Sequence, residues 1–295
     1  MNKSIGIVIP THQAKNHLIH CLPPLLKSPL KPHVLIIDSS SKDGTADLAQ
    51  TMGAEVIVIP QSEFNHGTTR EKGRQYLGTD IIVMMTQDAY AESTDMLELL
   101  LLPLFEGRVS LAYARQLPKV DAGIFGSFSR HFNYPDTSHV RNLSDASLYG
   151  AYTFFCSNSC AAYLNCALDE VDGFPSVLFG EDTITAARLL RKGHSIAYVA
   201  EAKVYHSHDY TLKQEFCRHF DMGLSREQYQ DLFSIPGHSE NSRGRAYVRA
   251  LLQLLWRESP QLIPYALLQS LAKWSGFRLG QMRVRNSSST WKRIF

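Results

Sequence analysis

Residues 34–45 read Val-Leu-Ile-Ile-Asp-Ser-Ser-Ser-Lys-Asp-Gly-Thr, a run of apolar residues that stops at an acid and passes into a polar turn. Four consecutive apolar side chains predict a strand buried on both faces, because a strand with one exposed face would alternate apolar and polar residues. A helical pattern starts directly after the turn, at Thr45. This stretch therefore predicts a unit of strand, turn and helix, with Asp38 at the carboxyl end of the strand.

The same unit recurs along the first third of the chain. Three more apolar runs are expected to form strands, namely residues 5–9, 55–59 and 81–85. Helical patterns lie between the runs, at residues 12–26, 45–52 and 68–76. Buried strands that alternate with helices predict an α/β domain with a mainly parallel sheet flanked by helices. Ligands bind beyond the carboxyl ends of the strands in such sheets, where Thr11, Asp38 and Asp88 fall.

The rest of the chain is less regular. Residues 117–149 show little periodicity, and we expect a functional loop region there. Shorter elements are predicted beyond it: a strand and turn at 153–163, a helix at 181–191, strands at 196–199 and 203–206, and amphipathic helices at 247–256 and 262–271. The α/β domain is thus followed by a helical C-terminal part.

The composition of the 295 residues is that of a folded globular protein, with 44% hydrophobic and 20% charged residues. It excludes disordered, collagen-like and coiled-coil proteins. The five cysteines include no C-x-x-C pair, which indicates a reducing compartment rather than a disulfide framework or a zinc ribbon. The N-terminal apolar run is too short for a signal peptide, and no window reaches the ~18 uninterrupted apolar residues of a membrane span. We expect a cytoplasmic protein.

The net charge of +2 hides an asymmetry between two parts of the chain. Residues 237–295 carry 10 Lys and Arg but 2 Asp and Glu, a net charge of +8, which leaves −6 on residues 1–236. All three tryptophans lie in the basic part, as Trp256, Trp274 and Trp291. We therefore expect a domain at 1–236 and a basic, Trp-containing helical extension at 237–295. The small total charge argues against a nucleic-acid partner.

Two roles are open for the extension. Lys and Arg are attracted to anionic lipid and Trp favours the membrane interface, so the extension can dock the protein peripherally on the inner face of the cytoplasmic membrane. Alternatively, it is a helical cap whose tryptophans pack against the domain and whose arginines are solvated.

Common enzyme motifs are absent from the sequence: G-x-x-x-x-G-K-[ST], G-x-G-x-x-G, G-x-S-x-G and H-E-x-x-H. What remains is a set of acids at strand and helix ends. Asp38 can accept from a ring N–H such as that of a pyrimidine, or it can cap the helix at Thr45, a role that suits Asp43 better. Glu181 and Asp182 begin a predicted helix, where acids complement the helix dipole and where a carboxylate kept ionised can act as a general base.

A second group of residues offers ligands for a cation or an anion. Asp88 follows a very apolar strand, and a divalent cation bound to phosphate would satisfy its charge, unless the carboxylate is simply solvated in a turn. His206 and His208 are two residues apart, so in an extended chain both point to one face and can share one site. Arg70 has a fork of donors that suits a diphosphate or base contact, although an ordinary surface arginine fits the sequence nearly as well.

Taken together, these residues resemble the family 2 inverting glycosyltransferases with the GT-A fold, over roughly residues 4–235. The resemblance rests on the order and spacing of these segments: Ile7-Val8-Ile9-Pro10-Thr11, Ile37-Asp38, Lys42-Asp43-Gly44-Thr45, Gln87-Asp88-Ala89, Asp172-Gly173-Phe174 and Gly180-Glu181-Asp182. Further segments are similar to the bacterial rhamnosyltransferases that use dTDP-L-rhamnose: Phe64 to Arg70, Thr86 to Ala89, Val204 to His208 and Lys273 to Gly280. The resemblance implies a GT-A domain with a C-terminal helical extension.

The resemblance also implies how a donor is bound. Asp38 would bind the nucleobase of a dTDP-sugar. Further contacts to the nucleotide sugar would come from Thr11, Arg70, Gln87 and Asp88.

Metal binding and catalysis are implied for the remaining residues. Asp88 would hold Mg²⁺ or Mn²⁺ on the diphosphate. His206 or His208 would complete the metal site, with His206 preferred because it ends the strand. Asp182 would be the catalytic base, and Glu181 would position the acceptor or the base.

One departure from the family pattern leaves alternatives open. The usual Asp-x-Asp is Thr86-Gln87-Asp88 in this chain, so metal affinity can be low. The leading hypothesis is transfer of L-rhamnose to a saccharide, expected to be lipid-linked, in the synthesis of a bacterial surface polysaccharide such as O-antigen or capsule. Another donor such as a UDP-hexose is an alternative, because Asp38 cannot tell thymine from uracil. A further alternative is an inactive nucleotide-sugar-binding module, against which the intact acids Glu181 and Asp182 argue.

Overall fold

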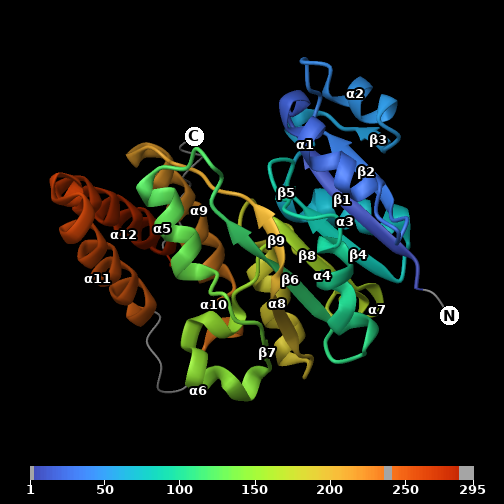
Figure 1. Ribbon diagram of the computed structural model, residues 1–295. Coiled ribbons are helices and arrows are strands. Elements are labelled where there is room, and N and C mark those ends of the chain that lie inside the picture. The colour runs from blue at the N-terminus through green and yellow to red at the C-terminus, as the bar shows by residue number, and fades with distance from the viewer. Residues whose placement is uncertain (1–2, 236–240, 286–295) are drawn as a thin grey trace.

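A β-sheet forms the centre of the protein in the computed structural model, which describes residues 3–235 and 241–285 (Figure 1). Within these ranges the sheet has nine strands: β1 Ile5–Thr11, β2 His33–Asp38, β3 Glu55–Val58, β4 Ile81–Met85, β5 Tyr90–Ala91, β6 Leu111–Leu117, β7 His139–Arg141, β8 Cys160–Leu164 and β9 Ile196–Tyr205. Their order is β3-β2-β1-β4-β8-β6-β9-β5, and β7 also pairs with β9. β1 to β4 pair in parallel, whereas β8 is antiparallel to β4 and β6. The predicted α/β class is confirmed.

Helices cover both faces of the sheet, and each face has its own apolar core. On one face lie α1 Lys15–Leu26, α2 Thr45–Thr51 and α4 Met96–Phe105. On the other lie α3 His66–Leu77, α7 Asn165–Asp169 and α8 Glu181–Arg191. Adjacent residues of β1 serve different cores, since Ile7 and Ile9 belong to the first and Val8 to the second. Burial on both faces explains why the strands are continuous apolar runs.

The register of the parallel strands brings their carboxyl ends to one edge. Thr11 at the end of β1 pairs with Asp38 at the end of β2, and β4 pairs with the other side of β1. Asp88 follows β4 at the same edge. The sequence therefore predicted correctly that Thr11, Asp38 and Asp88 lie at the carboxyl ends of the strands.

The middle of the chain is more regular than the sequence indicated. The expected loop region contains two helices, α5 Ile124–Asn133 and α6 Ala146–Tyr149, with β7 between them. The two strands expected near residues 196–206 are one strand, β9, whose pairing with β6 shifts between Ala114 and Arg115. The exposed, polar Glu201 interrupts the apolar pattern at this irregularity, which explains the error. The strand expected over 153–163 begins only at Cys160, because residues 150–154 form a short 3-10 helix.

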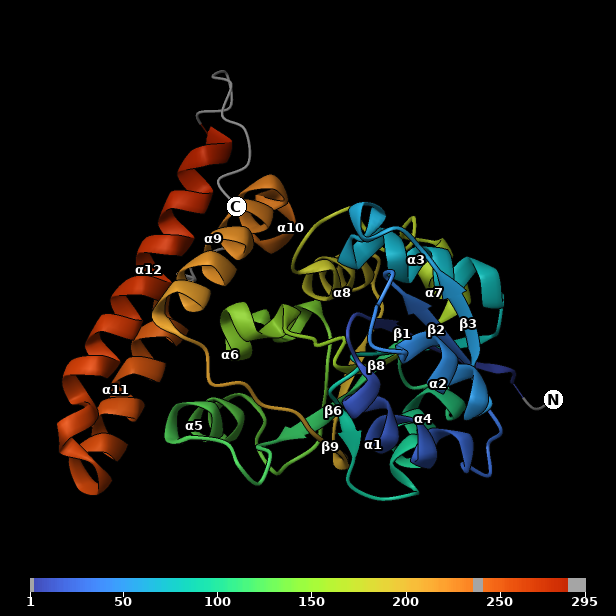
Figure 2. The same ribbon diagram turned by 90° about the horizontal axis from the view of Figure 1, so that it is seen from above.

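The C-terminal helices form a layer at one end of the molecule, beside α5 (Figures 1 and 2). These helices are α9 Leu212–Gln228, α10 Gln230–Phe233, α11 Asn241–Glu258 and α12 Ile263–Arg285. α12 crosses α9 so closely that a Cβ at Gly280 would lie 2.0 Å from the carbonyl oxygen of Phe220, and one at Gly276 would lie 2.4 Å from that of Phe216. Only glycine permits this approach without a shift of backbone. The boundary predicted at 236/237 lies outside the described residues, and α12 packs directly on α9, which precedes that boundary.

α12 buries small and polar residues and exposes large apolar ones. Its buried residues are Ala266, Gln269, Gly276, Gly280 and Gln281. Its exposed residues include Leu267, Leu268, Leu271, Trp274, Leu279 and Met282. Trp274 is 61% exposed, and Trp256 on α11 is 75% exposed. The alternative in which the tryptophans pack against the domain is therefore wrong for these two, and Trp291 lies outside the described residues.

Candidate active site

Asp38 is buried at the carboxyl edge of the sheet and is fully engaged by its own chain. It is 1% exposed, and it accepts hydrogen bonds from Thr11 Oγ1 at 2.9 Å, from Ser41 N at 2.8 Å and from Ser41 Oγ at 2.6 Å. The carboxylate therefore orders the loop that follows β2. A pyrimidine ring would have to displace Ser41 to reach it. Asp43 accepts from the backbone N–H of Thr45 at 3.1 Å, but the N-cap residue of α2 is Gly44, so Asp43 is not the cap of this helix.

Gln87 lies beside this loop and clamps the backbone that follows β1. Its Oε1 accepts from His12 N at 2.8 Å, and its Nε2 donates to His12 O at 3.1 Å. Both ends of the amide are used in this way. Gln87 therefore shapes the edge of the site in this structure.

Asp88 faces both histidines, which come from the chain just beyond β9. The carboxylate lies 3.5 Å from His206 Nε2 and 3.1 Å from His208 Nε2. The two Nε2 atoms are 3.1 Å apart, and one ligand atom from each of the three residues lies within 4.8 Å of the others. The structure therefore brings together the three residues predicted to bind metal.

Gln116, which the sequence analysis missed, fixes the ring of His206. Its Oε1 accepts from Arg130 Nη1 at 2.5 Å, and this atom must be the oxygen because a guanidinium only donates. The same oxygen is 2.9 Å from His206 Nδ1, so this nitrogen carries the proton. In the neutral ring, Nε2 then presents a lone pair toward Asp88. A hydrogen bond that fixes the tautomer of a metal-binding histidine is a general feature of metal sites.

The charge states of the cluster suit a cation. Burial, more than the nearby charge of Arg130, lowers the pKa of His206 to about 4, so the ring is neutral at physiological pH. Burial acts to raise the pKa of Asp88, but the neighbouring His206 and His208 outweigh it and hold that pKa below its usual range. Lys119 Nζ lies 4.0 Å from the Asp88 carboxylate, and its backbone N–H donates to Ser207 Oγ at 3.0 Å. Lys119 is a second residue that the sequence analysis did not single out.

The cluster fits a divalent cation by the chemistry of its donors. One carboxylate and two imidazole nitrogens form a mixed oxygen and nitrogen set, which suits Mn²⁺ better than Mg²⁺, since Mg²⁺ prefers oxygen ligands. A fixed tautomer at His206 and a deprotonated Asp88 meet the further requirement that ligands bind without protons.

Glu181 and Asp182 begin α8 and share one neighbour, Asn158. The Asn158 side chain donates to Glu181 Oε1 at 3.0 Å, and its backbone N–H donates to Asp182 Oδ2 at 3.1 Å. Thr183 N donates to the other oxygen of Asp182 at 2.7 Å. The two acids are therefore held by one loop at defined positions, which fits the predicted pairing of base and positioning residue.

Arg70 is placed differently from the expectation. It is 2% exposed, and its Nη1 lies 3.2 Å from Glu181 Oε1 and 3.0 Å from His66 Nδ1. Burial, with the Arg70 charge next in size, lowers the pKa of His66 to about 4, so the imidazole is a neutral acceptor. In this structure the guanidinium is closed off from a nucleotide and instead neutralises Glu181.

The two neighbouring acids have opposite proton affinities. Burial acts to raise the pKa of Glu181, but the Arg70 charge outweighs it and holds that pKa below its usual value. Burial and the negative charge of Glu181 raise the pKa of Asp182 to about 7. The helix N-terminus was expected to keep Asp182 ionised, but burial and its neighbour are stronger. A carboxylate with such a pKa can accept a proton near neutral pH.

Comparison with known sequences assigns the chain to a class. The Glycosyl transferase family 2 matches residues 6–171. O-antigen chain rhamnosyltransferase WbaN of Salmonella anatum is 37% identical over 287 residues, which cover 94% of this chain and 89% of that protein. O-antigen chain rhamnosyltransferase RfbN of Salmonella typhimurium is 35% identical, with the same shares covered.

Solved structures show the same fold. The mannosyltransferase PcManGT from Pyrobaculum calidifontis, in complex with GDP-Man and Mn²⁺, aligns with a TM-score of 0.66 at 12% identity, over 97% of this chain and 88% of that chain. TarS 1–349 of S. aureus with UDP-GlcNAc aligns with a TM-score of 0.56 at 12% identity, over 98% and 93%. The sheet and its carboxyl edge are those of a GT-A glycosyltransferase. The chain belongs to glycosyl transferase family 2.

Proposed function

We propose that this enzyme transfers L-rhamnose from dTDP-β-L-rhamnose to a saccharide acceptor, with inversion, during synthesis of an O-antigen. The observation that carries the transfer chemistry is that the two acids at the start of α8 differ in proton affinity. Arg70 keeps Glu181 ionised, whereas the pKa of Asp182 is raised to about 7. The choice of rhamnose and O-antigen is supported by the two relatives that cover 94% of the chain. The dTDP donor is supported by the segments that resemble the rhamnosyltransferases.

In a single displacement, charge develops in two places. The acceptor hydroxyl loses a proton, and Asp182 is the group that takes it. The departing diphosphate gains negative charge, and the Lys119 ammonium beside Asp88 is placed to offset part of it. A divalent cation, when bound by Asp88 with His206 and His208, would supply further charge neutralisation there. Glu181 and Asn158 fix the position of the base.

The donor assignment is tested by release of free nucleoside diphosphate from a panel of nucleotide sugars. We expect the protein with Mn²⁺ to hydrolyse dTDP-rhamnose slowly and to leave UDP-glucose and GDP-mannose nearly intact. With a lipid-linked saccharide present, mass spectrometry should show a product heavier by one deoxyhexose. Faster turnover of a UDP-hexose would overturn the choice of donor. A rise in melting temperature with dTDP-rhamnose and no turnover would indicate a binding module.

The base assignment predicts both a loss of rate and a pH dependence. Asp182→Asn should bind dTDP normally but lose at least about 10²-fold in transfer rate, as is typical for removal of a general base. In the wild type kcat/KM should rise as the pH rises through about 7 and then level off, because only the ionised carboxylate accepts a proton. Asp47→Asn is the control, since Asp47 also lies in the first turn of a helix but is exposed. Near-normal transfer by Asp182→Asn would remove Asp182 from this role.

The metal assignment, with Mn²⁺ preferred, predicts a change in the binding of nucleotide. Calorimetry should show that Mn²⁺ tightens dTDP binding to the wild type. Asp88→Ala should abolish this response, because the carboxylate is the charged ligand of the cluster. Asp136→Ala, which removes an exposed acid, should respond like the wild type. A full Mn²⁺ response in Asp88→Ala would contradict the assignment.

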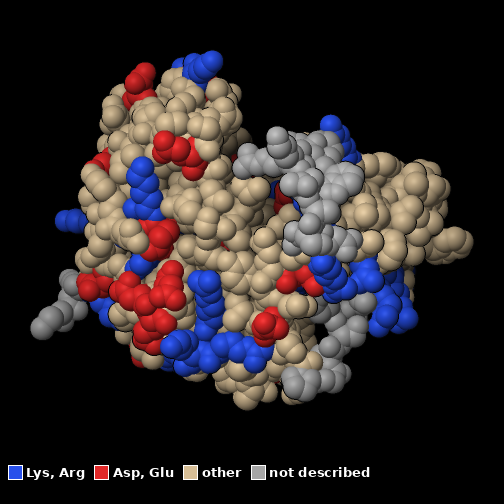
Figure 3. Space-filling model, turned by 180° about the vertical axis from the view of Figure 1, so that it is seen from behind, with Lys and Arg blue, Asp and Glu red and all other residues tan. Residues whose placement is uncertain are grey.

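We further propose that the C-terminal helices dock the enzyme peripherally on the cytoplasmic face of an anionic membrane. None of the helices in the described ranges is both long and apolar enough to cross a bilayer. The lobe formed by the C-terminal helices presents a broad uncharged area, with Lys and Arg gathered along its lower edge (Figure 3). The exposed leucines and tryptophans of α11 and α12 can enter the interface, and the basic residues favour anionic lipid.

Flotation with phosphatidylglycerol vesicles tests the docking. Leu268→Glu/Leu271→Glu should weaken binding at least about tenfold, because burying a leucine contributes ~1.5 kcal/mol or more and ~1.4 kcal/mol is a factor of ten. Val58→Glu/Leu148→Glu is the matched control, since both side chains are exposed apolar residues outside the C-terminal helices. Equal flotation of the wild type and the α12 variant would contradict docking through this face.

A further inference from the structure

The turn that precedes β8, residues 157–159, lies between the metal cluster and the two acids of α8. Because β8 is antiparallel to β4 and β6, it begins at the edge of the sheet where those two strands end. At this edge the backbone N–H of Thr86 donates to the carbonyl oxygen of Ser159 at 3.4 Å. The turn is well buried, with Asn158 2% and Ser159 7% exposed. It is therefore placed to contact both groups of functional residues.

Asn158 attaches this turn to the two acids, since its side chain donates to Glu181 and its backbone N–H donates to Asp182. A carboxylate only accepts, so the Nδ2 end of the amide faces Glu181. The Oδ1 end accepts from the hydroxyl of Tyr163 at 2.7 Å, and Tyr163 is a fully buried residue of β8. The place of the base therefore follows the place of the turn.

Gln116 attaches the same turn to the metal cluster. Its Oε1 is occupied by His206 and Arg130, so its Nε2 faces the other way and donates to Ser157 Oγ at 2.9 Å. The Ser157 hydroxyl donates in turn to Ser159 Oγ at 3.2 Å. One buried amide thus connects a histidine of the cluster with the residue that directly precedes Asn158.

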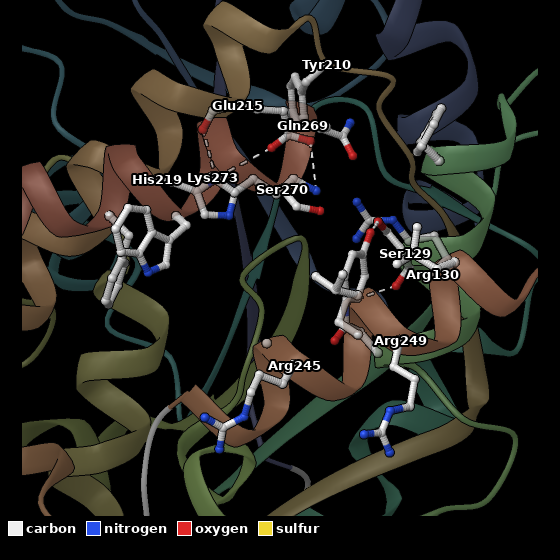
Figure 4. A pocket seen from close by; sticks show the side chains of 18 of the residues that line it. Ser129, Arg130, Tyr210, Glu215, His219, Arg245, Arg249, Gln269, Ser270 and Lys273 are labelled. Atoms are coloured by element: carbon white, nitrogen blue, oxygen red, sulfur yellow. Dashed lines mark hydrogen bonds and ion pairs between the residues drawn. The ribbon is translucent and has the colours of Figure 1, made fainter. Parts of the chain in front are cut away.

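Gln116 and Ser157 stand back from the space that is open to ligands. A cavity of about 1480 Å³ adjoins the cluster at His208, with walls from α5, α9, α11 and α12 (Figure 4). Arg130 borders this cavity and contacts Gln116, but neither Gln116 nor Ser157 lines it. The two residues are therefore suited to holding other residues in place rather than to contact with a substrate.

We propose that Gln116 and Ser157 are positioning residues that hold the base Asp182 in a fixed place relative to the metal cluster. In a single displacement the base and the leaving diphosphate act on opposite sides of the anomeric carbon, so their separation must match the reacting atoms. Misplacement by ~1 Å can cost about 10²-fold in rate. The inference rests on the proposed transfer reaction and adds two residues that act through others.

A pair of nearly isosteric variants tests the hydroxyl of Ser157 in the full chain. Ser157→Val leaves the Gln116 Nε2 group without its acceptor, so the turn should loosen and kcat for transfer should fall at least about tenfold. KM for the donor and the Mn²⁺ response of dTDP binding should stay unchanged, because Gln116 still contacts His206. Ser157→Thr keeps the hydroxyl and should transfer at nearly the wild-type rate.

The pH profile separates positioning from a general loss of folded protein. Burial and the charge of Glu181 raise the pKa of Asp182, and the hydrogen bond from Asn158 N–H opposes them. Loosening that bond should raise the pKa further, so the midpoint of kcat/KM should move to higher pH in Ser157→Val and remain in place in Ser157→Thr. The other ionisable groups that act on Asp182 or are acted on by it are unchanged in both variants: Glu181, Arg70, Tyr134, Cys156 and Tyr163.

Gln116→Met tests the link from its other end. It should raise the midpoint in the same direction and also weaken Mn²⁺ binding about tenfold or more, measured from the paramagnetic resonance of free Mn²⁺ in the presence of dTDP. Ser129→Val is the control, since it removes a hydroxyl beside Arg130 that bonds to Tyr247 instead (Figure 4). It should leave the midpoint unchanged.

An infrared band of protonated Asp182, identified by its loss in Asp182→Asn, gives the midpoint without any transfer assay. An unchanged midpoint in Ser157→Val, or equal effects of Val and Thr, would overturn the inference. So would a Gln116→Met protein in which Mn²⁺ binding alone is weakened. Normal transfer by Asp182→Asn would instead count against the proposed function, while the infrared midpoints would still decide whether the link exists.

Discussion

The buried ion pair between Arg70 and Glu181 is the interaction on which the chemistry of the site depends. Both side chains are almost fully buried, and removing one partner of such a pair typically costs about 3–5 kcal/mol because it leaves an isolated charge. Glu181 is thereby kept ionised at the start of α8, and its fixed charge lies beside Asp182. The positive end of the helix would lower the pKa of Asp182, but burial and Glu181 outweigh it. One arginine on α3 thus makes two adjacent carboxyl groups chemically different, which is how a pair of acids acquires separate roles.

The sequence could locate these acids but could not assign their proton affinities. The position of Glu181 and Asp182 at a helix start is a local pattern, so it was predicted correctly. Their pKa values depend on burial and on a guanidinium brought in from α3, and neither is visible in local spacing. The same limit explains why Arg70, read as a ligand contact, is a buried counter-ion here.

The cluster around Asp88 likewise combines features that are visible in the local sequence with contacts that depend on the fold. Asp88 follows an apolar strand and the histidines are two residues apart, so both features could be read from the sequence. That they meet depends on the order of the sheet, in which β4 and β9 are separated by β8 and β6. Gln116 was missed although a signal was present, because a polar residue inside the buried strand Leu111–Leu117 needs hydrogen-bond partners. Its partners, Arg130 and His206, could be found only from the fold.

The close crossing of α9 and α12 determines which residues of α12 are exposed. The Lys273 to Gly280 segment was recognised from sequence only as a similarity, and the structure supplies its physical reason, since any side chain at Gly276 or Gly280 would strike the backbone of α9. A helix that contacts its neighbour through glycine has no room for large residues on that side, so its leucines and Trp274 must point elsewhere. An amphipathic pattern alone would have placed those residues in a core. The crossing therefore fixes which side of α12 packs on α9 and at the same time leaves apolar side chains exposed on the remainder of the helix.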